Sequence, residues 1–200
     1  MAEEEHYFTA DPSVPFRREP FTCDVWGRRL DLMSGSGVYS RGRLDQGTAV
    51  LLRETSPPAP GRILDLGCGY GVIGLAIAAA VPDAVVTGVD VNERALLLAR
   101  ENAAALGVAD RFTALAADAV PDDATYDEIW SNPPIRIGKD ALHALLLTWL
   151  PRLAANGRTV MVVGKHLGGD SLQRWLGEQG FPTTRLASAK GFGVLESRRA

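Results

Sequence analysis

Asp65-Leu66-Gly67-Cys68-Gly69-Tyr70-Gly71 is the stretch that decides the fold. It overlaps a short apolar segment, Ile63–Leu66, and precedes a second apolar segment, Val72–Ala80. Glycines at such a turn let the backbone change direction and approach a ligand closely, and the amide groups that begin a helix favour a negative group on that ligand. The stretch therefore predicts a strand, a ligand-binding loop and a helix, which together form one unit of an α/β fold.

The glycines of this loop are compatible with two classes of cofactor. Gly69-Tyr70-Gly71-Val72-Ile73-Gly74 matches the G-x-G-x-x-G pattern of dinucleotide sites. Gly67, Gly69 and Gly71, with Asp65 two residues ahead, match the loop that binds S-adenosylmethionine (SAM) in class I methyltransferases. A carboxylate at this turn would repel a pyrophosphate, but it suits SAM, which carries an ammonium group and a cationic sulfonium. Asp65 therefore favours SAM, with NAD as the alternative.

Two further aspartates follow the strands predicted at 85–89 and 112–115. Asp90 ends the first strand and would accept hydrogen bonds from both ribose hydroxyls of either cofactor. Asp118 follows the second and would accept a hydrogen bond from an adenine amino group, although aspartate is also a good helix cap. Because the carboxyl ends of parallel strands meet at one edge of a sheet, we expect both carboxylates at the cofactor edge.

Outward from the loop, short apolar segments alternate with segments of helical periodicity. Further strands are predicted at 126–131, 159–163, 183–186 and 191–196, and further helices at 92–106, 141–153 and 171–178. This alternation is typical of a parallel sheet covered by helices on both faces. The pattern predicts an α/β, Rossmann-like domain.

The first 61 residues do not follow this alternation. Residues 1–20 are polar and contain three prolines, which indicates an irregular arm. Phe21–Trp26 and Arg29–Met33 alternate apolar with polar residues, so we expect a β-hairpin with Gly27-Arg28 as a type II′ turn. A helix is expected over 44–55. We divide the chain into an arm, hairpin and lead-in helix (1–56), a proline-rich linker (57–61) and a cofactor-binding domain (62–200).

Asn132-Pro133-Pro134-Ile135 comes directly after the predicted strand 126–131. Two prolines fix φ and remove two N–H donors, so we expect the Pro133 carbonyl to be held in one direction with little local competition. Asn132 adds a side-chain carbonyl, and two aimed acceptors form a receptor for an NH₂ group. The lone pair of an amine on a base is delocalised into the ring, and two acceptors on its hydrogens hold that pair out of conjugation. The tetrad therefore predicts methylation of an amino group, although Pro-Pro also simply ends strands.

Together these motifs resemble the class I SAM-dependent methyltransferases of amino groups. They are more closely similar to the short, single-domain form of the small-subunit ribosomal RNA guanine-N2 methyltransferase family. The resemblance covers about residue 6 to the end and includes Gly37-Val38-Tyr39-Ser40, Leu44-Asp45-x-Gly47-Thr48, the run from Asn132 to Lys139, and the tail Lys190–Leu195. It implies a seven-stranded, mostly parallel sheet whose last strand is antiparallel. It also implies that the substrate is ribosomal RNA, as a small (16S) subunit or an assembly intermediate.

The resemblance also implies roles for individual residues. The three glycines of the loop would line the methionine and ribose of SAM, with Asp65 near its amino group, Asp90 at the ribose and Asp118 at the adenine. The residues expected to bind the cofactor are Asp65, Gly67, Cys68, Gly69, Gly71, Asp90, Val91, Asp118, Ala119, Asn132, Gly47 and Thr48. The residues expected to carry catalysis are Asn132, Pro133, Pro134 and Ile135.

The residue after the prolines departs from the common pattern. Many amino-methyltransferases have tyrosine or phenylalanine there, and its ring stacks on the target base, whereas this chain has Ile135. From position alone, Tyr39, Arg136 and Phe192 are candidates to replace that stacking. Lys139 is a further candidate for contact with the substrate.

Charge is distributed unevenly along the 200 residues, of which 46% are hydrophobic and 22% charged. A formal net charge of −3 excludes a wholly basic protein that coats nucleic acid. Residues 63–135 hold 3 basic and 11 acidic residues, whereas residues 136–200 hold 10 basic and 4 acidic ones. If N-terminal arginines and this basic tail flank one cleft, the protein presents a basic face to phosphates.

Several classes of protein are not expected. Cys23 and Cys68 lie far apart and the three histidines have no partner pattern, so we expect no metal site. The acidic segment 1–6 lacks the apolar region of a secretory signal, and no apolar run is long enough to span a membrane, so we expect a cytoplasmic protein without a membrane partner. The open alternatives are methylation of a protein glutamine or a small metabolite, and a SAM-binding docking protein without turnover.

Overall fold

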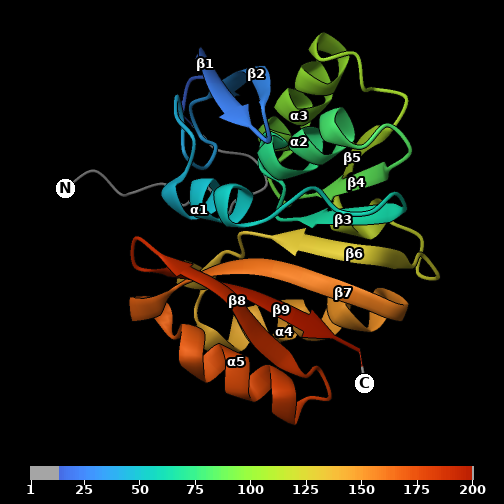
Figure 1. Ribbon diagram of the computed structural model, residues 1–200. Coiled ribbons are helices and arrows are strands. Elements are labelled where there is room, and N and C mark those ends of the chain that lie inside the picture. The colour runs from blue at the N-terminus through green and yellow to red at the C-terminus, as the bar shows by residue number, and fades with distance from the viewer. Residues whose placement is uncertain (1–13, 200) are drawn as a thin grey trace.

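The computed structural model describes residues 14–199, in which seven strands form one sheet and two form a separate hairpin (Figure 1). The sheet contains β3 (Arg62–Leu66), β4 (Val85–Val89), β5 (Phe112–Leu115), β6 (Tyr126–Ser131), β7 (Leu153–Gly164), β8 (Thr183–Ala189) and β9 (Phe192–Arg198). The hairpin contains β1 (Arg18–Val25) and β2 (Arg28–Gly35). The α-helices are α1 (Gln46–Glu54), α2 (Val72–Ala80), α3 (Glu93–Ala105), α4 (Lys139–Trp149) and α5 (Gly169–Glu178).

The strand order is β5-β4-β3-β6-β7-β9-β8. The first five strands in this order pair in parallel, and β9 runs antiparallel to both β7 and β8. The predicted seven-stranded, mostly parallel sheet with an antiparallel last strand is therefore confirmed. The chain order reverses between β3 and β6, and ligands of open α/β sheets bind beyond the carboxyl ends of the strands at such a point.

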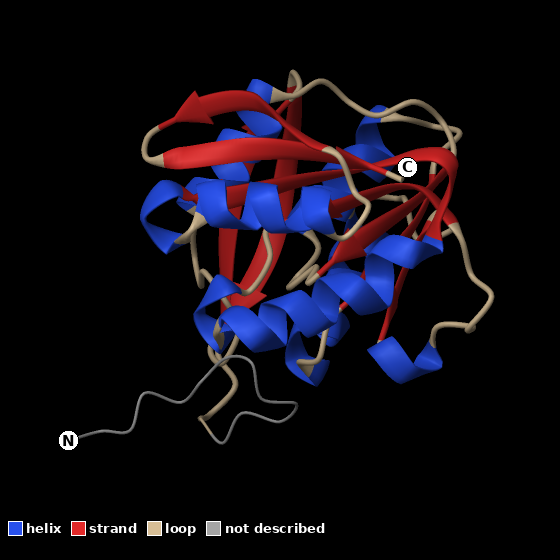
Figure 2. Ribbon diagram, turned by 90° about the horizontal axis from the view of Figure 1, so that it is seen from below, coloured by secondary structure: helices blue, strands red, loops and turns tan. Residues whose placement is uncertain are grey.

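Successive residues of the central strands serve opposite faces of the sheet, because side chains alternate along a strand. On β3, Ile63 packs in a core with the hairpin and α1 to α3, whereas its neighbour Leu64 packs in a second core on the other face. On β7, Val162 belongs to the first core, whereas Met161 and Val163 pack with α4 and α5. Figure 2 shows helices on both sides of the sheet. The two periodicities of the sequence thus produce the three layers.

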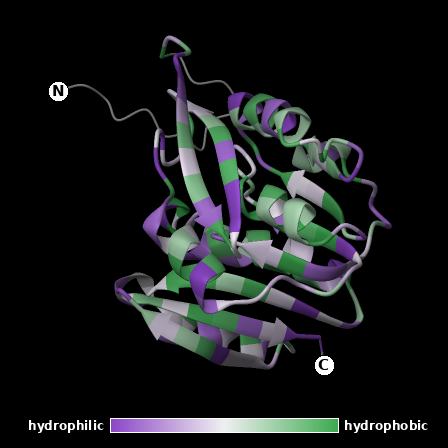
Figure 3. Ribbon diagram, turned by 45° about the horizontal axis from the view of Figure 1, so that its top comes forward, coloured by the Kyte–Doolittle hydropathy of each residue, from purple (hydrophilic) through white to green (hydrophobic). Residues whose placement is uncertain are grey.

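The hairpin turn differs from the sequence prediction. Val25 pairs with Arg28, so the turn is Trp26-Gly27, one residue earlier than expected. Both turn residues have positive φ, 49° and 74°, which is the geometry of a type I′ turn and not of type II′. Two contacts hold Trp26 there: its Nε1 donates to the Thr55 carbonyl (2.8 Å), and its ring packs edge-on against Trp130. In Figure 3 the hairpin strands show alternating hydrophobic and hydrophilic bands.

Element boundaries follow local signals closely. α2, β4, β5 and β6 have the predicted bounds. α1 begins two residues later than predicted, after the Asp45 cap, and α4 ends at Trp149 because Pro151 follows in a 3₁₀ turn. β1 begins at Arg18, inside the predicted irregular arm, most of which (residues 1–13) lies outside the described residues.

The hairpin and α1 share a hydrophobic core with the sheet. Leu30 of the hairpin and Leu51 of α1 are buried in the same cluster as Ile63 and Trp130. The proline-rich residues 57–61 connect α1 to β3, and the proposed domain division at this segment stays a prediction. Between residues 14 and 199, no helix is long and apolar enough to cross a membrane.

Candidate active site

A cavity of about 1050 Å³ opens beyond the carboxyl ends of β3, β4 and β6. Three parts of the chain form its walls: the glycine loop with the end of β4, the Asn132–Arg136 segment after β6, and the N-terminal residues between Val38 and Thr48. Leu145 and Trp149 of α4 and Phe192 of β9 also line the cavity. The cavity therefore lies at the reversal of strand order, where an open α/β sheet binds its ligand.

The glycine loop forms a thin wall of this cavity. Its backbone is tied to β4, since the amides of Gly67 and Cys68 both donate to the Val89 carbonyl (2.8 and 2.9 Å). Gly67 and Gly69 have positive φ (73° and 54°), and no described atom lies within 4 Å of a Cβ added at Gly69. A Cβ at Gly67 would meet only the Pro134 ring, at 4.0 Å, among the described atoms. Both glycines thus leave open space for a ligand.

Gly71 is required for a different reason. Its φ is 96°, and an added Cβ would lie 2.8 Å from Leu75 Cδ1 and 3.4 Å from the Cβ of Ala99. Gly71 therefore permits the packing of α2 against α3, and it is not among the residues that line the cavity. The three glycines that look equivalent in the sequence divide into two that face the cavity and one that packs the helices.

Asp90 is fixed at the end of β4. Its Oδ2 accepts from the Gly69 amide (2.8 Å) and its Oδ1 from the Asn92 amide (2.9 Å). Burial raises the pKa of this carboxyl, and the two amide hydrogen bonds partly oppose that rise. Asp90 and the exposed Val91 both line the cavity, as the sequence analysis expects of cofactor-binding residues.

The structure places the Asp65 carboxylate away from the cavity. The side chain is fully buried, and its Oδ2 accepts from the Gly74 amide in the first turn of α2 (2.8 Å). Its Oδ1 has no hydrogen-bond partner among the described residues. Burial raises the pKa of Asp65 to about 7. Asp65 therefore lies outside the cavity lining, where its carboxyl supports the start of α2, and its expected position near the ammonium group of a cofactor stays a prediction.

Three other cofactor residues expected from the sequence lie outside the cavity lining: Asp118, Ala119 and Gly47. Asp118 and Ala119 belong to an exposed 3₁₀ turn after β5, and of that turn it is Ala117 that lines the cavity. A backbone that turns immediately after β5 directs the Asp118 side chain to solvent. The proposed contact between Asp118 and an adenine amino group stays a prediction.

Asn132 connects the catalytic tetrad to the N-terminal part of the chain. Its Nδ2 donates to Asp45 Oδ2 (2.7 Å) and to Thr48 Oγ1 (3.0 Å). Its Oδ1 accepts no hydrogen bond from the described residues, and Asn132 lines the cavity. The side-chain carbonyl is therefore the free end of this amide, which is the acceptor that an amine receptor needs.

The Pro133 carbonyl is less free than the sequence indicates. It accepts from the Ile135 amide at 2.8 Å, across a Pro134 backbone with φ −74° and ψ 68°, the geometry of an inverse γ-turn. We expected little local competition for the Pro133 carbonyl, and this is wrong. The two prolines lack N–H groups, but the amide of Ile135, the next residue that has one, reaches this carbonyl. A carbonyl oxygen has two lone pairs, so Pro133 keeps one for a ligand.

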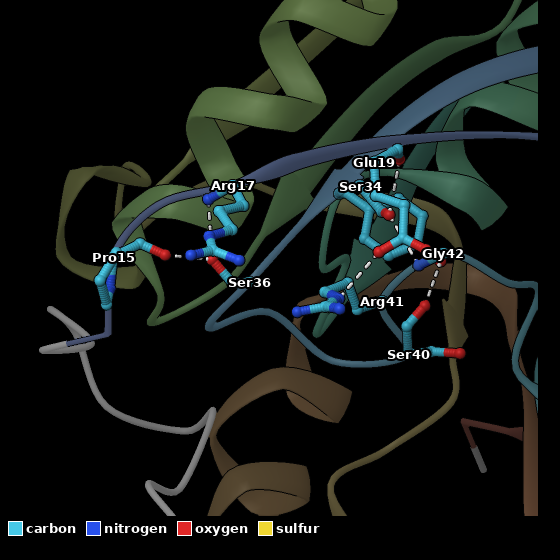
Figure 4. A network of polar contacts seen from close by, with 9 residues as sticks. Pro15, Arg17, Glu19, Ser34, Ser36, Ser40, Arg41 and Gly42 are labelled. Atoms are coloured by element: carbon cyan, nitrogen blue, oxygen red, sulfur yellow. Dashed lines mark hydrogen bonds and ion pairs between the residues drawn. The ribbon is translucent and has the colours of Figure 1, made fainter.

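The N-terminal wall is held by the hairpin. Figure 4 shows the polar contacts between the hairpin and the loop that precedes α1. Ser34 Oγ donates to the Glu19 carbonyl (2.9 Å) and accepts from the Gly42 amide (2.7 Å), and Glu19 pairs with Arg41 (2.8 Å). Ser36 joins the residues before β1, since its hydroxyl accepts from the Arg17 amide at 2.8 Å. The hairpin therefore positions the loop at the mouth of the cavity.

A family model described as "Methyltransferase small domain" matches residues 29–196, which include the glycine loop, Asn132 and most of the N-terminal wall. The chain belongs to this family.

Three proteins similar to this methyltransferase small domain differ in length. "Uncharacterized protein YbxB" of Bacillus subtilis is 32% identical over 203 residues, which covers 98% of each chain. Ribosomal RNA small subunit methyltransferase C of Pseudomonas aeruginosa is 32% identical over 198 residues, which covers 96% of this chain and 58% of that protein. The T. thermophilus 16S rRNA N2 G1207 methyltransferase (RsmC), solved with AdoMet and guanosine, matches with a TM-score of 0.82 at 25% identity. That match covers 94% of this chain and 52% of RsmC, so the chain spans a little over half of both named methyltransferases.

The predicted substrate residues of this methyltransferase small domain divide into two groups. Tyr39, Arg136 and Phe192 line the cavity, whereas Lys139 begins α4 outside the lining. Arg41 and Arg43 line the same cavity as Arg136, so arginines of the N-terminal region and of the basic tail do meet at one cleft. Other N-terminal arginines are engaged elsewhere, as in the pair between Arg18 and Glu101.

Sequence reasoning missed two residues of the site. Asp45 appears in the sequence only as part of a family motif, yet it contacts Asn132 directly. Trp149 is 3% exposed, as a core residue would be, but it also lines the cavity. A helix cap just before a short helix was the available signal for Asp45, whereas nothing local marks Trp149 as a wall of the cavity. Within residues 14–199, no group of three or more His, Cys, Asp or Glu residues is arranged to hold a metal ion.

Proposed function

We propose that this chain is a SAM-dependent methyltransferase that transfers a methyl group to N2 of a guanine in small-subunit (16S) ribosomal RNA. The observation that carries the proposal is the free Asn132 Oδ1, which lines the same cavity as the glycine loop. Family membership and the names of the matched relatives support the reaction and the substrate class. An RNA substrate of this kind also implies that the protein acts in the cytoplasm.

The glycine loop fits SAM. The open Cβ positions of Gly67 and Gly69 allow a bulky adenosyl group to approach the backbone, and Asp90 offers a half-buried carboxylate to ribose hydroxyls. When bound, SAM supplies a methyl group on a cationic sulfonium, which is open to attack by a nucleophile. Arg43 and Arg136 at the same cavity add positive charge that suits the phosphates of RNA, and Arg41, which pairs with Glu19, lies beside them.

Asn132 and Pro133 would receive the target amine. Asn132 Oδ1 accepts one N–H of the guanine amino group, and the remaining lone pair of the Pro133 carbonyl accepts the other. Both acceptors favour the positive charge that develops on the nitrogen and hold its lone pair out of conjugation with the ring. The aliphatic side chain of Ile135 and the rings of Tyr39 and Phe192 provide apolar surface for the base.

The proposal is tested with undermethylated small ribosomal subunits, labelled SAM and separation of the nucleosides. We expect label in N2-methylguanosine, and about a hundredfold loss of rate in Asn132→Ala with SAM affinity retained. Gln179→Ala, which truncates an exposed amide at the end of α5, serves as the control and should match the wild-type protein.

Other outcomes identify the alternatives. Label in protein glutamine or in a small metabolite, with none in N2-methylguanosine, would replace the RNA substrate but keep the amine receptor. SAM binding without turnover on any of these substrates would leave a docking protein. An Asn132→Ala variant with near-normal rate would refute the amine receptor itself.

A further inference from the structure

Three contacts converge on Asp45, which lies directly before α1. Its Oδ2 accepts from Asn132 Nδ2 (2.7 Å) and from the Thr48 amide (3.0 Å). Its Oδ1 accepts from the hydroxyl of Tyr39 (2.6 Å). One carboxylate thus joins the start of a helix, a residue of the cavity mouth and the side chain of the tetrad, which lies 87 residues away in the chain.

These contacts determine which end of the Asn132 amide faces the cavity. A carboxylate only accepts hydrogen bonds, so the amide must present Nδ2 to Asp45, and Thr48 Oγ1 accepts from the same nitrogen at 3.0 Å. A rotation of the amide by 180° would place Oδ1 against the carboxylate, two acceptors with no hydrogen between them, and would lose the hydrogen bond from Nδ2 to Asp45. The orientation that exposes Oδ1 is therefore the one that Asp45 stabilises.

We propose that Asp45 is a positioning residue, which holds the Asn132 amide so that Oδ1 points at the amino group of the substrate. The inference rests on the proposed function, because it assigns the orientation of that reaction's amine acceptor. Gly47 supports the arrangement through its lack of a side chain. A Cβ there would lie 3.0 Å from Asp45 Oδ2, 3.2 Å from Phe192 Cε1 and 3.4 Å from Asn132 Oδ1, so a larger residue would have to displace these side chains.

Asp45 also caps α1, and two substitutions separate capping from positioning. Serine is as good an N-cap as aspartate, so Asp45→Ser keeps the bond to the Thr48 amide, but its shorter side chain cannot reach Asn132. Asp45→Asn keeps every contact: its carbonyl oxygen replaces Oδ2, and its NH₂ group donates to the Tyr39 hydroxyl in place of Oδ1. Asparagine cannot act as a proton acceptor, so its rescue of the rate would also exclude that role for Asp45.

The kinetic test compares these variants on small ribosomal subunits. We expect Asp45→Ser to lower kcat about tenfold or more, with the SAM dissociation constant and the melting temperature close to those of Asp45→Asn, and Asp45→Asn to restore most of the lost rate. In an Asn132→Ala background, Asp45→Ser should cause no further loss, because the amide that it positions is absent. An unchanged kcat in Asp45→Ser, or an equal loss in both backgrounds, would overturn the proposal.

A second measurement does not depend on the substrate. The NH₂ resonances of Asn132 are assigned in a ¹⁵N spectrum by their loss in Asn132→Ala. In Asp45→Ser they should shift and their protons should exchange faster with water, whereas Asp45→Asn should preserve slow exchange. Resonances that are unchanged in Asp45→Ser would overturn the positioning role. If they change as expected while the wild-type protein fails to methylate RNA, the proposed substrate is wrong and the positioning role stands.

Discussion

Replacing Asp65 with asparagine should remove a large pH dependence from the stability of this protein. The carboxyl is fully buried beneath the glycine loop, and burial raises its pKa from 3.8 to about 7. The protonated form is therefore favoured in the folded state, whereas the unfolded chain ionises near pH 4. Stability from this group is fully present below pH 4 and is lost as the pH rises through about 7.

The magnitude follows from the two pKa values. At about 1.4 kcal/mol for each tenfold change in the ionisation equilibrium, the full effect is about 4 kcal/mol. Between pH 5 and pH 8 the change is about 2.5 kcal/mol, since part of the effect is already lost by pH 5. Asp65→Asn keeps an acceptor for the Gly74 amide but has no ionisation, so its unfolding free energy lacks this component.

The assay is urea unfolding followed by tryptophan fluorescence at several pH values from 5 to 8. From pH 5 to pH 8, the unfolding free energy of the wild-type protein should fall by about 2.5 kcal/mol relative to that of Asp65→Asn. Asp83→Asn, an exposed carboxyl in the turn before β4, serves as the control and should run parallel to the wild-type protein. Parallel curves for wild-type and Asp65→Asn would refute the reasoning, because they would show that Asp65 is ionised in both states.

Two further predictions concern the cofactor wall and the buried charges. Gly69→Ala should weaken SAM binding about tenfold or more in calorimetry, because the added methyl group enters the open space and a φ of 54° disfavours alanine. Gly177→Ala in α5 serves as the control and should bind SAM normally. Equal SAM affinities of the two variants would mean that the cofactor does not occupy this space. Arg158→Met should lower the unfolding free energy by about 3 kcal/mol, since it leaves the Glu128 carboxylate (10% exposed) without a cation among the described residues, whereas Glu196 (13% exposed) keeps Arg198. Arg29→Met, which breaks the exposed pair of Arg29 with Asp31, serves as the control and should change the unfolding free energy little. If Arg158→Met lowered the unfolding free energy no more than Arg29→Met does, a role for the buried charges would be contradicted.

The sequence by itself determined most of the secondary structure and the residues of the tetrad. Glycine and proline positions, helix caps and the two hydrophobic periods act over a few neighbouring residues, so they can be interpreted without the fold. Asn92, for example, begins the helix predicted over 92–106 and caps α3, with its side chain accepting from the amides of Arg94 and Ala95. The same local reasoning placed Asn132 and the glycine loop at the carboxyl ends of two strands, and the structure shows that these strands, β3 and β6, are neighbours.

Only the tertiary structure decided which polar groups are free to act. Asp65 follows the expected spacing, yet packing turned its carboxyl under the loop and away from the cavity. The Asn132 amide takes its orientation from Asp45 and Thr48, 87 and 84 residues earlier in the chain, and no local pattern in the sequence encodes such a contact. Hydrogen-bond partners depend on which surfaces the folded chain brings together, so the free end of an amide is a property of the packed molecule.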